Sequence, residues 1–206
     1  MIVAEEIDGA MRLDGFELEN EVRALVERVL VGVLDGPAPG VDSSPQTPAQ
    51  IHEGECIAIG ADHGGFDLKE ALKARLVEAG WAVDDRGTHS TEACDYPDFA
   101  HAVARRVGTG MCTVGIMVDG AGIGSAMVAN KIPGVRAAAC YDLSTARNSR
   151  EHNRANVLTL GAGLTGPALA WQIVQEWLAT PWGGDRHARR VALIREVEDM
   201  YIRTDA

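Results

Sequence analysis

Three features are absent from this sequence of 206 residues, and each absence argues against a class of protein. No uninterrupted apolar run approaches the roughly 18 residues that a transmembrane helix needs. The four cysteines form no C-x-x-C pair, and three of them lie in or beside apolar runs, which favours buried side chains and a reducing compartment. There is no basic stripe either, so we expect no nucleic-acid partner.

The net charge of -11 is unevenly distributed along the chain. Residues 1–55 contain three arginines and twelve acidic residues, whereas residues 56–206 are nearly balanced. The chain opens with MIVAEEIDGA, which lacks the basic region of a signal peptide. We therefore expect a protein of the cytoplasm, or of a compartment filled from the cytoplasm, with no membrane partner.

The first 50 residues are predicted to form a helical extension followed by a linker. Residues 36–50 hold four of the eight prolines and cannot support a core, which predicts the linker. This linker separates the extension, residues 1–35, from one enzyme-sized domain, residues 51–206. Within residues 17–34 the apolar side chains recur at the spacing of one helical face, and they are Leu18, Val22, Leu25, Val26, Val29, Leu30 and Val33.

The apolar stripe of this helix needs a partner surface, because a helix of this length is marginal in water. It can pack on its own domain or on a second copy of the chain. A membrane surface suits it less well, because its polar face is rich in acidic residues. An amphipathic helix on a Pro/Ser-rich linker also resembles the encapsulation peptides that load enzymes into bacterial microcompartments. That resemblance implies shell proteins as partners and the interior of a microcompartment as the location.

From Cys56 onward, apolar strands alternate with helices. This alternation predicts an α/β fold, a Rossmann-like three-layer sandwich with a mostly parallel sheet of about five strands. Ligands bind outside the carboxyl ends of such strands, which directs attention to the loops that follow them. We predict strands at residues 56–61, 81–85, 113–118, 135–140 and 156–161, and helices at 67–80, 97–110, 124–131, 142–153, 166–180 and from 183–190 onward.

The loop after the first strand carries two polar side chains and two glycines. Asp62 and His63 are followed by Gly64 and Gly65, which suits a backbone that turns closely around a ligand. The alternative is that Asp62 caps the next helix and His63 is a surface residue.

The loop after the third strand begins with Asp119 and continues as Gly120-Ala121-Gly122-Ile123-Gly124-Ser125. Its backbone N–H groups can bind an anion, either a phosphate or an enolate oxygen. Ser125 stands where the dinucleotide-binding fingerprint needs a glycine, so we expect no nicotinamide cofactor.

Two further candidate groups lie at helix ends. His152 and Asn153 end one predicted helix, where they could also simply cap its carbonyl groups. Arg186 and Arg190 lie four residues apart on one face of the last helix, a spacing suited to a phosphate. A solvated helix would carry the same charges.

Several of these motifs occur together and in order: GADHGGFDLKE, DYPDFAHAVA, GAGIGSAMVANKIPGVRAA, TARNSREHNRANVLTLGA and GGDRHARR. Together they resemble the ribose-5-phosphate isomerase type B and galactose-6-phosphate isomerase family, over nearly all of residues 56–200. The resemblance implies an aldose-ketose isomerase that acts on a small phosphosugar, best guessed as ribose 5-phosphate, and needs no metal or cofactor. It also implies a homodimer or tetramer whose active sites combine residues from two subunits.

The resemblance assigns roles to the candidate residues. His152 assists opening of the sugar ring, Asn153 holds a hydroxyl or oxyanion, and the glycine turn stabilises an enediolate. The implied catalytic residues are Asp119 and His152, and the implied substrate-binding residues are Asp62, His63, Gly120, Gly122, Gly124, Ser125, Asn153, Arg186 and Arg190.

The sequence departs from the family pattern at the position of the base. Asp119 stands where many members have a cysteine, and Ser125 stands where other members have a glutamate. A carboxylate can remove a proton next to a carbonyl if Met117, Val118 and Ile123 shelter it from water. The alternative is that Asp119 is a solvated cap of the following helix.

Two other departures concern substrate binding. Ala121 replaces the usual threonine or serine, and Gly163 and Leu164 stand where an arginine usually serves the phosphate. We therefore keep two alternatives open, an isomerase for a different phosphosugar and a non-catalytic sugar-phosphate-binding or scaffold protein.

Overall fold

The computed structural model describes residues 55–202, except for the side chain of Asp185. The predicted helix of residues 1–35 and the linker of residues 36–50 lie outside this part of the chain. The strands are β1 (Cys56–Ala61), β2 (Ala82–Asp85), β3 (Val114–Asp119), β4 (Ala137–Ala139) and β5 (Val157–Gly161), and the helices are α2 (Phe66–Glu78), α3 (Tyr96–Gly108), α4 (Ile123–Ala129), α5 (Leu143–Asn153), α6 (Pro167–Ala179) and α7 (Asp185–Tyr201).

All five strands form one parallel sheet in the order β2-β1-β3-β5-β4. The three central strands are apolar and almost wholly buried on both faces, as expected of a covered parallel sheet. The chain leaves β1 towards one edge of the sheet and leaves β3 towards the other. The crevice at their carboxyl ends is therefore the topological switch point, where α/β proteins bind ligands.

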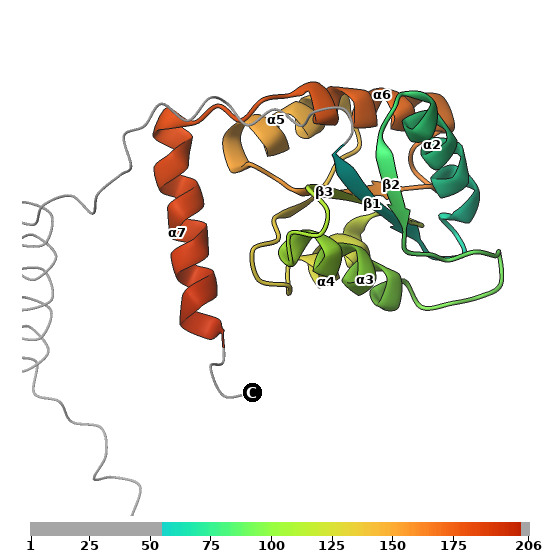
Figure 1. Cartoon of the computed structure of the whole chain (residues 1–206), viewed down its shortest axis with the longest axis horizontal. Coiled ribbons are helices and arrows are strands. Elements are labelled where there is room, and N and C mark those ends of the chain that lie inside the picture. The colour runs from blue at the N-terminus through green and yellow to red at the C-terminus, as the bar shows by residue number, and fades with distance from the viewer. Residues whose placement is uncertain (1–54, 203–206) are drawn as a thin grey trace, which may run out of the picture. The chain divides into compact units, whose positions relative to one another are not determined.

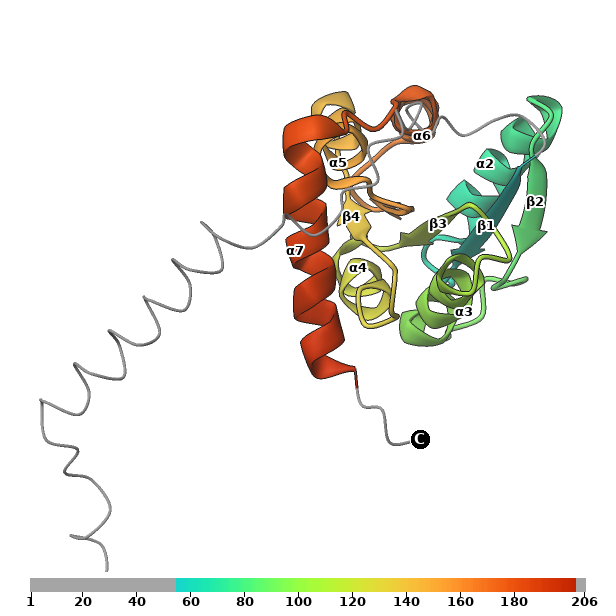
Figure 2. The ribbon, with the colours of Figure 1, turned by 60° about the vertical axis from the view of Figure 1, so that its left-hand side comes forward.

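Helices cover both faces of the sheet, which confirms the predicted three-layer architecture (Figure 1). Helices α3 and α4 pack on one face, and α2, α5 and α6 pack on the other. The larger core lies under α2 and α6, where the fully buried Trp177 packs with Leu72 and Ile173. Helix α7 contacts α5 and stands beside the sandwich rather than on the sheet (Figure 2).

Several helix boundaries follow from local chemistry. Asp142 begins α5 with a capping box, since its carboxylate accepts a hydrogen bond from the Thr145 amide at 2.7 Å. Pro97 and Pro167 lie in the first turns of α3 and α6, where no amide donor is lost. None of the helices within residues 55–202 is long and apolar enough to cross a membrane.

The cysteines differ from expectation. Cys56 and Cys112 form a disulfide between the start of β1 and the segment before β3, where their Cα atoms lie 4.6 Å apart. The expectation that Cys56 and Cys112 are buried thiols is therefore wrong. The physical reason is that the two residues, 56 positions apart in sequence, enter neighbouring parallel strands side by side. Cys140 is a buried thiol, and Cys94 is a partly exposed one.

Candidate functional site

Two of the predicted site loops meet at the switch point. Ala61 and Val118 are partners in the β1–β3 register, so Asp62 and Asp119 follow neighbouring strand ends. The Asp62 amide donates a hydrogen bond to the Val118 carbonyl at 3.2 Å. We call the group formed by Asp62, His63 and residues 119–125 the strand-end cluster.

Asp119 is the most enclosed acidic group of this cluster, with an exposed fraction of 4%. One carboxylate oxygen accepts hydrogen bonds from the amides of Ala121 and Gly122. The other accepts from the amide of Ser125, at 3.1 Å, and from its hydroxyl. Asp119 thus organises the glycine turn and the start of α4, as the capping alternative predicted, but it is buried rather than solvated.

The surroundings of Asp119 are only partly as expected. Met117 and Val118 are fully buried beneath it, whereas Ile123 is 49% exposed and does not shelter it. The amides of Gly122 and Ser125, which we expected to face a ligand, donate to the Asp119 carboxylate in this structure. The carboxylate therefore lies inside the turn, enclosed by the backbone that follows it.

The glycines of the turn serve different purposes. Gly122 has a left-handed backbone, with φ of 80°, at the entrance to α4. A Cβ atom at Gly124 would lie 2.6 Å from the ring of Tyr96, so close packing requires this glycine. A Cβ atom at Gly120 would meet nothing within 4 Å. Gly120 therefore exposes its backbone to open space, where a ligand can approach it.

Asp62 and His63 form the other wall of the strand-end cluster. The Asp62 carboxylate accepts a hydrogen bond from the Gly65 amide at 2.9 Å and closes the turn that leads into α2. A Cβ atom at Gly65 would collide with the Val118 carbonyl, so this turn rests directly on β3. His63 is exposed, and its Nδ1 atom lies between the amide of Cys94, at 3.2 Å, and the carbonyl of Cys94, at 3.1 Å.

The remaining predicted residues, together with His187, form a second group, which we call the helix-end cluster: His152, Asn153, Arg186, His187 and Arg190. The ring of His152 at the end of α5 stacks on the ring of His187 in α7, with centroids 4.3 Å apart. His152 Nδ1 lies 2.9 Å from the side-chain nitrogen Nδ2 of Asn148, and Arg186 Nε donates to His187 Nε2 at 3.2 Å.

His187 was missed by the sequence analysis. It is 6% exposed and occupies the centre of the helix-end cluster. Burial, His152, Arg186 and Arg190 together lower its pKa below the usual value of 6.5. The only signal in the sequence was its place between the two candidate arginines.

Within one chain the two clusters lie at opposite ends of the strands. Helix α5 begins after the carboxyl end of β4 and ends at Asn153, shortly before the amino end of β5. Asp119, in contrast, ends β3 at the carboxyl edge. The structure therefore does not bring Asp119 and His152 together within a single copy.

One group of potential metal ligands exists among the described residues, and it lies outside both clusters. It comprises Cys56, Asp84 and Cys112. Both sulfur atoms are joined in the disulfide, and the Asp84 carboxylate pairs with Arg106 Nε at 2.5 Å. This donor set is already occupied by bonds within the protein.

The comparison with known proteins decides the family. The model of the Ribose/Galactose Isomerase family matches residues 57–194, about two thirds of the chain. This chain belongs to that family. The relatives that it matches align with it over almost their whole length.

Ribose-5-phosphate isomerase B of Escherichia coli is 44% identical over 142 residues, which cover 69% of this chain and 95% of that protein. The structure of ribose-5-phosphate isomerase B from Clostridium thermocellum is similar with a TM-score of 0.70 and 48% identity, over 71% of this chain and 99% of the other. The enzyme from Mycoplasma genitalium, solved with bound ribulose-5-phosphate, gives a TM-score of 0.70 at 36% identity, over 72% of this chain and 99% of that one.

Proposed function

We propose that this protein is an aldose-ketose isomerase that interconverts ribose 5-phosphate and ribulose 5-phosphate without a metal or cofactor. Membership of the ribose/galactose isomerase family and 44% identity to a ribose-5-phosphate isomerase B support the reaction. The observation that carries the proposal is the buried Asp119 at the switch point, beside Asp62 and His63.

The reaction moves one proton between neighbouring carbons. A base removes the proton from C2 of the open-chain aldose, which leaves an enediolate, and return of the proton to C1 with transfer of the O2 proton to O1 gives the ketose. Asp119 is the proposed base, because it is the most enclosed carboxylate at the switch point. In this proposal the backbone of Gly120, which is exposed, faces the developing oxyanion, within the turn that includes Gly122, Gly124 and Ser125.

The helix-end cluster supplies the complementary groups in this proposal. His152 assists ring opening, Asn153 holds a substrate oxygen, and Arg186 and Arg190 bind the phosphate through charged hydrogen bonds. Asp62 and His63 bind the sugar from the opposite side. Because the two clusters lie at opposite ends of the strands, they can serve one substrate only if they come from two copies of the chain.

We therefore propose a homodimer, or a tetramer built from such dimers, in which the helix-end cluster of one copy completes the strand-end cluster of another. The apolar side chains of α7 support self-association, since Leu193 and Ile194 are each 46% exposed and Val197 is 55% exposed. Such a face is typical of a surface that is covered in the assembled protein.

A substrate panel assayed at several pH values tests the reaction. We expect turnover of ribose 5-phosphate above all other aldose phosphates, with a rate that follows the titration of a single base. Saturable binding of the panel without turnover would support the non-catalytic alternative instead. Faster turnover of a hexose phosphate would support the alternative of a different phosphosugar.

The extension has a separate proposed role. We propose that this is a protein of the cytoplasm whose residues 17–34 bind shell proteins of a bacterial microcompartment. This binding would place the enzyme inside the microcompartment. The apolar stripe and the proline-rich linker of residues 36–50 support this proposal. The family model begins only at residue 57, so the extension is additional to the matched domain.

A further inference from the structure

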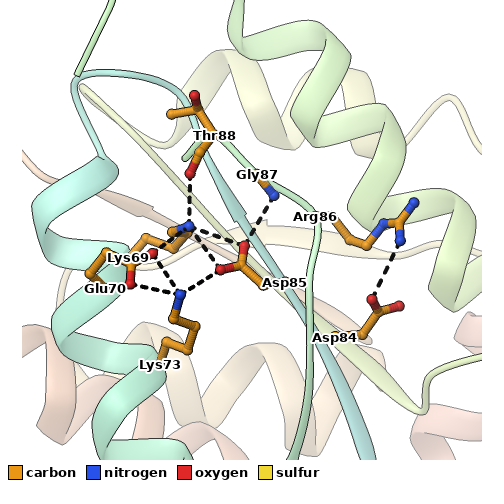
Figure 3. Close-up of polar contacts among 8 residues, drawn as sticks. All are labelled: Lys69, Glu70, Lys73, Asp84, Asp85, Arg86, Gly87 and Thr88. Atoms are coloured by element: carbon orange, nitrogen blue, oxygen red, sulfur yellow. Dashed lines mark hydrogen bonds and ion pairs between the residues drawn. The ribbon is translucent and has the colours of Figure 1, made fainter. Parts of the chain in front are cut away.

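A wholly buried lysine lies beside the strand-end cluster and has no role in the reaction described above. Lys69 of α2 has an exposed fraction of 0%. Its Nζ atom donates to both carboxylate oxygens of Asp85, at 3.0 Å each, and to the backbone carbonyl of Thr88 at 2.8 Å (Figure 3). It also pairs with Glu70 at 2.7 Å.

The charges around Lys69 are balanced by a second lysine. Lys73 pairs with Asp85 and with Glu70, at 2.6 Å each, so two cations face two carboxylates (Figure 3). Burial alone would raise the pKa of Asp85, but hydrogen bonds from Lys73, the Gly87 amide and Lys69 hold that pKa below its usual value. Lys73 is partly exposed and donates to Glu70 and Asp85 but not to Thr88, which distinguishes the two lysines.

The backbone around Thr88 is hydrogen-bonded to the strand that ends at the candidate site. The Thr88 amide donates to the Ala61 carbonyl at 2.6 Å, and the Ala61 amide donates to the Gly87 carbonyl at 2.6 Å. This segment therefore extends the pairing of β2 along β1 to the residue immediately before Asp62. Lys69 bonds the same segment from the helix that follows Asp62 and His63 in sequence.

The chain beyond Thr88 forms a wall of the site. Six residues further on, the backbone of Cys94 brackets Nδ1 of His63, and Tyr96 packs against Gly124. The loop of residues 88–95 is thus anchored at one end by Lys69 and at the other by its contacts with His63 and α3.

We propose that Lys69 is a positioning residue for substrate binding: it holds the loop of residues 88–95 against the turn of Asp62 and His63, so that His63 presents its free edge to the sugar. This inference rests on the proposed isomerase function for its kinetic consequence. Its structural part, that Lys69 orders the loop, does not depend on the reaction.

The experiment compares Lys69→Met with Lys73→Met in the full-length protein. Both substitutions remove one cation from the same two carboxylates, but only the first removes the bond to Thr88. We expect Lys69→Met to lower kcat/KM about 10- to 100-fold, mainly through KM, because a displacement of about 1 Å in a positioning group has effects of that size. Lys73→Met should stay within about twofold of the parent, since it breaks a partly exposed pair.

Alkylation of Cys94 gives a readout that is independent of activity. Cys140 is buried and the other two cysteines are joined, so under non-reducing conditions a thiol reagent reports on Cys94. We expect Lys69→Met to raise the alkylation rate about tenfold by local opening of the loop, and Lys73→Met to leave it unchanged. Lys69→Gln retains a donor and should lie between Lys69→Met and the parent; it also replaces Lys69→Met if that variant does not fold.

The outcomes separate the two proposals. Parental alkylation rates in both Lys69 variants would overturn the positioning role, whether or not activity falls. A loss of activity with equal losses in Lys69→Met and Lys73→Met would also overturn it, because the shared carboxylates would then explain the effect. If the parent itself isomerises no sugar phosphate, the proposed function fails, while the alkylation comparison still decides the role of Lys69.

Discussion

The strand-end and helix-end clusters are built by different means. In the strand-end cluster, short side chains and glycines are held by the ends of two buried parallel strands, and Asp119 accepts four hydrogen bonds from its own turn. In the helix-end cluster, long cationic and imidazole side chains project from α5 and α7, and Arg186 and Arg190 are exposed.

This difference fits the two tasks that we assign to the clusters. Proton transfer requires placement within a few tenths of an ångström, and a buried strand end gives that precision. Phosphate binding tolerates longer side chains, because charge and a forked geometry carry most of the interaction. The precise half therefore lies inside the fold, and the adaptable half lies at the exposed ends of α5 and α7.

Replacement of Asp119 tests the precise half and should have the largest effect. We expect Asp119→Asn to lower kcat at least about a hundredfold, the usual scale for loss of a general base. Steady-state kinetics on protein shown to be folded by circular dichroism measures this. Ser125→Ala, which removes one hydroxyl donor to the same carboxylate, is the control and should cost less. A rate within a few-fold of the parent would assign the base to another group.

Replacement of the arginines tests the adaptable half. Arg190→Met should raise KM for ribose 5-phosphate about 10- to 100-fold with a smaller change in kcat, since a charged hydrogen bond contributes about 1.5 to 3 kcal/mol. Arg189→Met on the same turn of α7 is the matched control. An equal rise in KM for both variants would mean that general charge, rather than a specific contact, attracts the substrate.

Mixing the two kinds of variant tests whether the halves belong to different copies. Asp119→Asn and Arg190→Met proteins, each nearly inactive at low substrate, should regain about a quarter of the parental activity after unfolding and refolding together, because half of the dimers then hold one intact site. Activity that equals the mean of the two separate samples would place both clusters in the site of one copy and contradict the shared site.

The pH dependence of stability tests the packing at the centre of the helix-end cluster. The folded protein lowers the pKa of His187, so below about pH 6.5 the unfolded chain binds more protons and stability falls as the pH falls. We expect the melting temperature of the parent to decrease between pH 8 and pH 5.5, and His187→Gln to flatten that decrease. His101→Gln, on the exposed side of α3, controls for the loss of an imidazole. An unchanged slope in His187→Gln would argue against this linkage.

Removal of residues 1–50 should have the smallest effect on catalysis. We expect parental kcat and KM from the truncated protein, since the family model begins at residue 57, together with loss of co-purification with shell proteins. Unchanged partitioning with the shell would remove the proposed targeting role, and a fall in kcat would instead indicate that the extension packs on the domain.

Much of the fold could be predicted because its strands are apolar runs bounded by glycines and polar residues. The confirmed features include the parallel five-stranded sheet and Asp142 as the start of α5. The fourth strand is shorter than predicted, residues 137–139 rather than 135–140. At its start, the Arg136 amide is held by the Asn156 side chain at 2.7 Å and not by the strand ladder.

The site was less accessible from sequence. The positions of Asp62 and Asp119 follow from strand ends, but the hydrogen bonds that enclose Asp119 depend on how the turn folds back. Lys69 gave no signal, because a lysine on a helix is normally solvated and its partner Asp85 lies sixteen residues away. The disulfide and His187 likewise depend on contacts between segments that periodicity does not relate.

The space around two glycines at the switch point, Gly65 and Gly120, has a practical consequence for engineering. Gly65 is pressed onto the Val118 carbonyl, so any side chain there would lift the loop of Asp62 and His63 off the sheet. Gly120 faces empty space on the same rim and is exposed. A library aimed at altered sugar preference should therefore diversify position 120 and leave position 65 untouched.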